Sequence, residues 1–190
     1  DWDLPDSEQR FAMAAFGNHQ LTSAGYMAIG FDHFARPDDS LSIASAKGTL
    51  HRNFQGYTDD NCPIMIGLGA SAISGFPDFL FQNEKHVGIY RTRAQAQNFT
   101  VSRGVHRTAI DRVRGALIEK LLCTGNSGPV PADILESAKP RLDIFASNKL
   151  ARIESSSIVI EPAGLPYSRA IASTLDDYRV AGGNQFSLAI

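Results

Sequence analysis

The sequence predicts an α/β domain followed by a mostly helical, winged-helix-like C-terminal domain. The first half is predicted by a capped helix that is followed, after a glycine, by an apolar strand, which is the pattern of an α/β sheet. In the second half, an amphipathic helix, shorter helices and a small two-stranded hairpin predict the helical, winged-helix-like domain. We place the boundary in the polar stretch between residues 92 and 106, which gives domains over 1–95 and 96–190.

The first helix is expected to begin at Asp6, which can cap it, with Glu8 as an acidic residue in its first turn. It should end at Gly25. The apolar run 26–31 then predicts a buried strand. Residues 32–37 are predicted to form a polar loop at the carboxyl end of that strand.

A short helix is predicted over 41–47, because Asp39 can cap its start and Gly48 can end it. A second buried strand is predicted over 63–68. It should run into a turn of small residues.

The second half opens on a helix whose start is indicated by Thr108 and, three residues later, Asp111. Residues 125–129 are predicted to be a loop. The apolar stripe of the helix is formed by Ile110, Val113, Leu117 and Leu121.

The next helix should begin at Pro131, and Pro140 should restart or kink it. A small hairpin is predicted over 150–154 and 157–161. A final helix is predicted over 165–178.

Composition excludes several classes of protein. The 18 Lys and Arg against 20 Asp and Glu leave a net charge of −2, so no bulk nucleic-acid footprint is visible. No apolar run approaches the about 20 residues that cross a bilayer, and the N-terminus does not read as a signal peptide. Cys62 and Cys123 are too far apart for a local metal motif or a disulfide framework. We expect no metal ligands in this chain, no membrane partner and a cytoplasmic location.

Asp32, His33 and Arg36 are candidate site residues because they directly follow a predicted strand. Ligands of α/β sheets bind at the carboxyl ends of strands. His33 offers an imidazole, which can act as an acid or a base, and Arg36 offers a fork that matches a carboxylate. The alternative, equally open from the residues alone, is a polar loop whose aspartate caps a turn.

Two further segments could contact a ligand. Gln55 stands beside Phe54, and aromatic residues around an amide can build a pocket with one orienting hydrogen bond. The segment 67–69, Gly-Leu-Gly, would let a backbone approach a ligand closely. The alternatives are a surface loop at Gln55 and tight packing at 67–69. The glycines are not spaced as a dinucleotide-binding fingerprint.

A cluster of basic residues near the start of the helix at Thr108 admits a different class of function, a winged-helix module that binds nucleic acid. Acidic residues dilute this charge, so we expect a solvated face or contacts to acidic groups, and no nucleic-acid partner. The basic residues are Arg103, His106, Arg107, Arg112 and Arg114.

Three ordered blocks resemble one known family. Residues 25–39 read Gly-Tyr-Met-Ala-Ile-Gly-Phe-Asp-His-Phe-Ala-Arg-Pro-Asp-Asp, residues 50–58 read Leu-His-Arg-Asn-Phe-Gln-Gly-Tyr-Thr, and residues 67–74 read Gly-Leu-Gly-Ala-Ser-Ala-Ile-Ser. These blocks are similar to the oxygen-independent coproporphyrinogen III oxidases, radical S-adenosylmethionine enzymes of haem biosynthesis. The resemblance is strong over 4–82 and weaker to the end.

The resemblance implies oxidative decarboxylation of coproporphyrinogen III to protoporphyrinogen IX. In the family a 4Fe-4S cluster cleaves S-adenosylmethionine, and the resulting radical abstracts a hydrogen from a propionate. The implied fold is an incomplete (β/α) barrel followed by the helical domain, so this chain would be the α/β remnant of the barrel and the C-terminal domain. The family's Cys-x-x-x-Cys-x-x-Cys motif is absent here. The fragment alone should therefore hold neither cluster nor S-adenosylmethionine and should be inactive.

Residue by residue, Gln55 and Ile73 match family positions beside the second S-adenosylmethionine. Asp32, His33 and Arg36 match the barrel-strand motif that faces the active site, in roles the resemblance does not assign. The full-length enzyme is expected to be a monomer, and a truncated barrel could self-associate through exposed edges. The rival interpretations are a radical S-adenosylmethionine paralogue such as a haem chaperone, and the winged-helix binding module.

Overall fold

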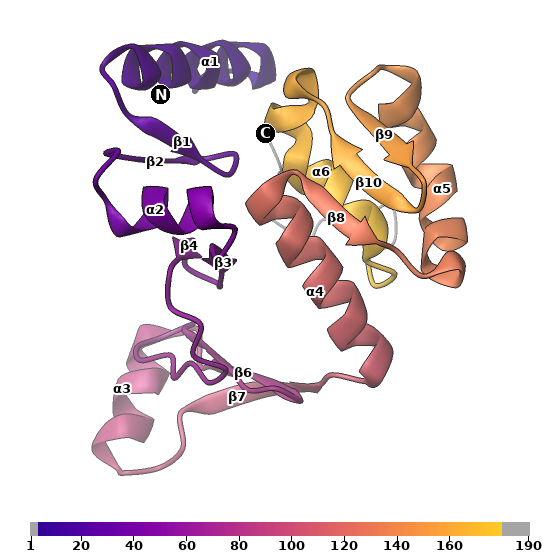
Figure 1. The fold of residues 1–190 in the computed structure, drawn as a ribbon. Helices are drawn as coiled ribbons and strands as arrows, with labels where there is room; N and C mark the ends of the chain where they lie inside the picture. The colour runs from indigo at the N-terminus through magenta and orange to yellow at the C-terminus, as the bar shows by residue number, and fades with distance from the viewer. Residues whose placement is uncertain (1–3, 180–190) are drawn as a thin grey trace. The chain divides into compact units, whose positions relative to one another are not determined.

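The computed structural model describes residues 4–179, in which helices alternate with small antiparallel sheets (Figure 1). These residues belong to two compact units, the first built from 1–59 and 116–190 and the second from 60–115. No closed barrel is present in the described part. The units do not coincide with the domains expected over 1–95 and 96–190, and that boundary stays a prediction. Among residues 4–179, no helix is long and apolar enough to cross a membrane.

The first helix, α1 (Ser7–Ser23), begins where the sequence predicts. The Asp6 carboxylate accepts a hydrogen bond from the Gln9 amide at 2.8 Å, and the Gln9 side chain accepts one from the Asp6 amide at 2.9 Å. This reciprocal pair satisfies two amides that a helix start leaves without partners.

The predicted buried strand 26–31 and polar loop 32–37 are wrong in two respects: the chain turns back within them, and of residues 26–31 only Ile29 is buried. Strand β1 (Met27–Ile29) pairs antiparallel with β2 (His33–Ala35), and Ile29 stands opposite His33. The turn is possible because Gly30 has a φ of +60°. A Cβ at this position would also collide with the Tyr57 ring.

Helix α2 (Ser40–Lys47) confirms the predicted short helix. The Asp39 carboxylate accepts a hydrogen bond from the Leu41 amide at 2.9 Å, and Gly48 ends the helix in the left-handed conformation. A hairpin of β3 (His51–Arg52) and β4 (Tyr57–Thr58) follows. The small core beneath these elements consists of Ile29, Ala35, Ala44, Leu50, Tyr57 and Cys123.

Helix α4 (Ala109–Thr124) starts at the predicted cap, where the Asp111 carboxylate accepts hydrogen bonds from the Thr108 amide and hydroxyl. Its predicted apolar stripe is correct in its second half only. Leu117 and Leu121 are buried, whereas Ile110 and Val113 are exposed.

Residues 126–129 form a strand rather than the predicted loop. Strand β8 (Asn126–Pro129) pairs with β10 (Ser157–Ile160), which also pairs with β9 (Ala151–Glu154), as the predicted hairpin requires. The buried Ser127 hydroxyl accepts a hydrogen bond from the Ile158 amide at 2.9 Å and so adds to this pairing. The strand was not predictable from local pattern, because its partner lies some thirty residues away.

Helix α5 (Ala132–Ser147) continues through Pro140, although a kink or restart was expected there. The predicted single helix 165–178 is instead three short pieces: η1 (Pro162–Tyr167), α6 (Ser168–Ala172) and η2 (Ser173–Leu175). Prolines at 162 and 166 explain the irregular start, since proline lacks the amide that continues a helix.

The larger core lies where α4, α5 and α6 pack on the β8–β10–β9 sheet (Figure 1). The arrangement is a mixed helix and sheet module, and the specific winged-helix description is not confirmed. The core residues with no exposed surface are Leu121, Ile134, Ala138, Leu142, Ile158, Ile171 and Leu175.

The second unit is an antiparallel sheet of β5 (Ile73–Gly75), β6 (Phe79–Asn83) and β7 (Val101–His106), with α3 (Val87–Gln95) between the last two strands. The strand predicted over 63–68 is wrong. Only Met65 makes a bridge, to Gly75, and most of this stretch is exposed. Strand β7 instead occupies part of the polar stretch in which the domain boundary was placed.

Candidate functional site

Two of the three candidates around the β1–β2 turn lie together. His33 Nδ1 is 2.7 Å from Asp32 Oδ1, and the His33 ring stands edge-on to the Tyr57 ring at 5.2 Å between centroids. Arg36 does not join them: its side chain is 75% exposed and lies 3.7 Å from Asp38. The structure therefore supports a dyad of Asp32 and His33 and leaves Arg36 at the surface.

Arg52 is a residue of this cluster that the sequence did not single out. Its guanidinium carbon lies 4.9 Å from the centre of the Phe31 ring and 4.7 Å from that of Tyr57, at cation–π distance from both. The side chain is only 21% exposed, and Nη1 is buried without a hydrogen bond, 3.8 Å from Asp32 Oδ1. A hairpin register could have identified Arg52 as part of this cluster, because Arg52 and Tyr57 are directly opposite on β3 and β4.

The β3–β4 hairpin is tied to α4 by polar contacts. The Glu119 carboxylate lies 3.0 Å from His51 Nδ1 and accepts a hydrogen bond from the Arg52 amide at 3.2 Å. The Tyr57 hydroxyl donates to the Leu122 carbonyl at 2.9 Å. Burial raises the pKa of Tyr57 well above its usual range, so the hydroxyl remains protonated and keeps donating. The hairpin is therefore anchored at both of its strands.

Gln55 lies at the tip of this hairpin, in a turn closed by Asn53. The Asn53 side-chain oxygen accepts hydrogen bonds from the amides of Gln55 at 2.8 Å and Gly56 at 3.2 Å, and the Asn53 amide donates to the Gly56 carbonyl. Gln55 is exposed, and within the described structure its side chain makes no hydrogen bond. Its amide is therefore available to a ligand on a turn of fixed shape.

Ile73, the second residue singled out by resemblance, belongs to the second unit, where it begins β5. A Cβ at Gly67 would lie 2.6 Å from the Ile73 carbonyl oxygen, so the two backbones are in direct contact. The buried Asn83 side chain donates to the carbonyls of Gly67 and Gly69, both at 3.0 Å. The structure therefore shows tight packing at Gly67, whereas Leu68 is 86% exposed and a Cβ at Gly69 would meet no atom within 4 Å.

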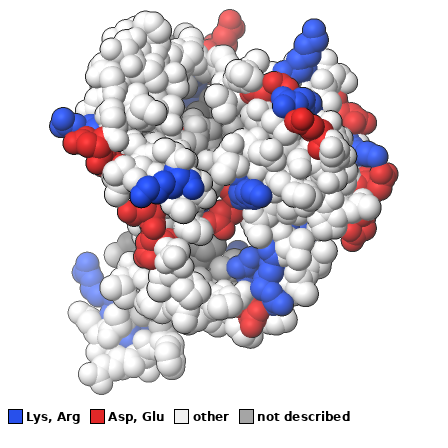
Figure 2. Space-filling model, viewed as in Figure 1, with Lys and Arg blue, Asp and Glu red and all other residues white. Residues whose placement is uncertain are grey.

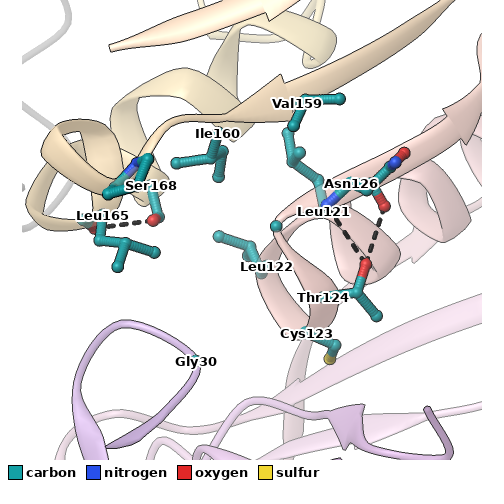
Figure 3. Close-up of a pocket in the computed structure, with 12 residues that line it drawn as sticks. Gly30, Leu121, Leu122, Cys123, Thr124, Asn126, Val159, Ile160, Leu165 and Ser168 are labelled. Carbon is teal, nitrogen blue, oxygen red and sulfur yellow. Dashed lines mark hydrogen bonds between the residues drawn. The ribbon is translucent and has the colours of Figure 1, made fainter.

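A cavity of about 510 Å³ lies within the first unit, between the end of α4, β10 and η1 (Figure 3). Its walls include Leu121, Leu122, Ile160 and Leu165. Its polar side chains already have partners: the Thr124 hydroxyl donates to the Asn126 carbonyl, and the Ser168 hydroxyl donates to the Leu165 carbonyl. None of the predicted site residues lines it, so this cavity is not the predicted site.

The basic cluster is partly paired with acid. Arg112 lies 2.6 Å from Asp78 within the second unit. On the face drawn in Figure 2, Lys and Arg atoms lie in small groups beside Asp and Glu atoms and form no continuous basic stripe. This mixture is unlike the one-sided charge of a nucleic-acid interface.

In residues 4–179, no group of three or more His, Cys, Asp or Glu could hold a metal ion.

The two cysteines differ in their surroundings. Cys62 is exposed and Cys123 is buried. Burial, reinforced by the Glu119 charge, raises the pKa of the Cys123 thiol to about 11. Because the thiolate is the reactive form, iodoacetamide at neutral pH should modify Cys62 and spare Cys123, as peptide mass spectrometry would show. Equal labelling in the folded protein would contradict this.

The same shift predicts a pH dependence of stability. A raised folded-state pKa means that the folded protein holds the Cys123 proton more tightly than the unfolded chain does. The stability that Cys123 contributes is therefore present below its ordinary pKa of 9 and is lost as the pH rises towards about 11. Cys123→Ala should remove this component, which urea unfolding on either side of that window would detect.

The chain was compared with known proteins in sequence and in fold. The chain matches no protein-family model. It is 34% identical to the oxygen-independent coproporphyrinogen III oxidase of Bradyrhizobium diazoefficiens over 98% of its length, 37% identical to that of Pseudomonas aeruginosa over 93%, and 34% identical to that of Escherichia coli over 100%. These matches cover 43%, 40% and 44% of the respective relatives, so the chain spans less than half of their length.

The structural comparison agrees with the sequence comparison. A solved structure of coproporphyrinogen III oxidase from Escherichia coli, described as a radical SAM enzyme, superposes with a TM-score of 0.81 at 33% identity. The superposition covers 93% of this chain and 43% of that one. Sequence and fold thus agree over nearly every residue described above, and the chain is similar over nearly its whole length to part of the oxygen-independent coproporphyrinogen III oxidases.

Proposed function

We propose that this chain is the C-terminal part of a cytoplasmic enzyme of haem biosynthesis that oxidatively decarboxylates coproporphyrinogen III to protoporphyrinogen IX. The observation that carries the proposal is the match, over nearly the whole chain and in both sequence and fold, to enzymes named for this activity. The full-length protein acts as a monomer on this substrate and needs neither nucleic acid nor a membrane. The C-terminal module, winged-helix-like in its order of elements, packs on the barrel.

S-adenosylmethionine together with a 4Fe-4S cluster supplies the radical that begins the reaction in this family. The residues of this chain are suited to bind S-adenosylmethionine but not the cluster. Gln55 presents an unpaired amide on a rigid turn, and Ile73 presents a half-buried aliphatic side chain. An amide can orient the polar end of S-adenosylmethionine and an aliphatic side chain can pack on it. Asp32 and His33 lie beside the Gln55 turn, where the His33 ring contacts Gly56.

The cluster does not fit this chain. Its cysteines are one exposed and one buried thiol in different compact units, and the family motif needs three. The cluster is therefore held by residues outside this chain. In the full-length protein, the double variant Cys62→Ser, Cys123→Ala should retain the iron and sulfide content of the parent after anaerobic reconstitution. A fall in iron content while the protein remains folded would assign a cluster ligand to this chain.

The decisive experiment is an anaerobic assay of the full-length protein with coproporphyrinogen III, S-adenosylmethionine and a reductant. We expect protoporphyrinogen IX and carbon dioxide. A protein that carries its cluster and cleaves S-adenosylmethionine but leaves coproporphyrinogen III unchanged would contradict the proposal and favour a haem chaperone.

A further inference from the structure

The placement of Gln55 depends on more than its own turn. The hydrogen bonds to Asn53 fix the shape of residues 53–56, but every one of them lies within the turn. They do not determine where the turn sits relative to the rest of the first unit. Something outside the turn has to do so if Gln55 is to meet a ligand in a fixed geometry.

The strands on either side of the turn are anchored to α4, and His33 adds a contact with the turn itself. Gly56 is buried and has a φ of +151°, a conformation that favours glycine. A Cβ on Gly56 would lie 2.6 Å from His33 Nε2 and 3.0 Å from Cε1. The imidazole edge therefore rests directly on the backbone of the residue that follows Gln55.

The His33 ring is itself held from two sides. Asp32 Oδ1 lies 2.7 Å from Nδ1, and the ring meets Tyr57 edge-on, at an interplanar angle of 86°. Tyr57 is in turn anchored to the Leu122 carbonyl on α4. A side chain that is oriented by a hydrogen bond and by packing can hold its neighbour in place.

We propose that His33 is a positioning residue: it sets the place of the Asn53–Gly56 turn and thereby of the Gln55 amide, with Asp32 fixing the ring. This inference rests on the proposed function, because it takes Gln55 as a contact of S-adenosylmethionine. It gives Asp32 and His33 a role that requires neither proton transfer nor contact with the reacting atoms.

The first test measures S-adenosylmethionine affinity by isothermal titration calorimetry on the full-length, cluster-loaded protein, which needs no turnover. His33→Ala should weaken binding about fivefold to tenfold, the loss expected when one orienting hydrogen bond is misplaced. His33→Phe keeps a ring against Gly56 and should stay within about twofold of the parent. A proton-transferring histidine would lose its function equally in both variants, and that outcome in the activity assay would overturn the inference.

The second test is a double-mutant cycle with Gln55→Ala. If His33 acts through Gln55, His33→Ala should have little further effect on affinity once Gln55 is gone. If the loss of S-adenosylmethionine affinity in the double variant equals the product of the losses in the two single variants, His33 acts independently of Gln55, and the inference is overturned. Should His33→Ala fail to fold, Asp32→Asn, which leaves the ring on Gly56 but weakens the contact that orients it, replaces it in the cycle.

Hydrogen exchange separates failure of this inference from failure of the proposed function. His33→Ala should speed exchange of the amides of Gln55 and Gly56, whichever substrate the enzyme uses. If the parent protein leaves coproporphyrinogen III unchanged, the proposed function fails, while the affinity cycle and the exchange rates still decide the role of His33. If His33→Ala leaves the exchange rates of the Gln55 and Gly56 amides unchanged, His33 does not position the turn.

Discussion

Replacing Gln55 by alanine in the full-length enzyme should lower the rate of decarboxylation about 100-fold while leaving cluster content and stability unchanged. A misplaced reactant costs about this much in rate, because reaction geometry is sensitive to displacements near 1 Å. Stability should not change, because the Gln55 side chain is exposed and makes no hydrogen bond in the described structure. The measurements are anaerobic turnover, iron content and urea unfolding.

Gln20→Ala is the matched control, since it removes an exposed amide from α1. It should turn over like the parent. Normal turnover by Gln55→Ala, or loss of its fold, would place Gln55 in the scaffold. Ile73→Ala is a less specific probe, because Ile73 is half-buried and its truncation also removes packing.

The second large effect concerns stability. Leu142 on α5 has no exposed surface and lies in the larger core. Leu142→Ala should destabilise the protein by about 2–5 kcal/mol, because it removes buried methyl groups and leaves a cavity. Native-state hydrogen exchange of α5 amides would report the loss locally, without requiring the whole protein to unfold in one step.

The control lies two residues further along the same helix. Ile144 is 64% exposed, so Ile144→Ala keeps helix propensity and loses little burial. We expect its effect to stay within about 0.5 kcal/mol. Equal destabilisation by the two variants would mean that α5 is not packed as described.

Local chemistry decided which elements could be predicted. The starts of α1, α2 and α4 were predictable because Asp6, Asp39 and Thr108 cap amides only two or three residues away. The strands β2 and β8 were not, because pairing depends on residues elsewhere in the chain. The sequence of a polar or glycine-containing segment does not by itself indicate that the segment pairs with a strand elsewhere in the chain.

The candidate site shows the same division. Asp32 and His33 are sequence neighbours, and their placement after an apolar run was enough to select them. Arg52 was not selected, since its environment is made by Phe31 from one hairpin and Tyr57 from another. Gln55 was noted from its aromatic neighbour, but its role, and the choice of Ile73, came from resemblance: nothing in their spacing connects a hairpin tip of one compact unit to the first residue of a strand in the other.

The contacts of the β3–β4 hairpin with Glu119 and Leu122 have a consequence for how the protein is made. They join residues 65 to 68 positions apart, so the second unit is an insertion between two halves of the first. On the ribosome, the hairpin must wait for α4, which at about 5–20 residues per second means a delay of about 3–14 s. During that interval the second unit, continuous in sequence, can fold first. Lengthening it should cost the first unit little, since doubling a closed loop adds only about 0.6 kcal/mol of closure entropy.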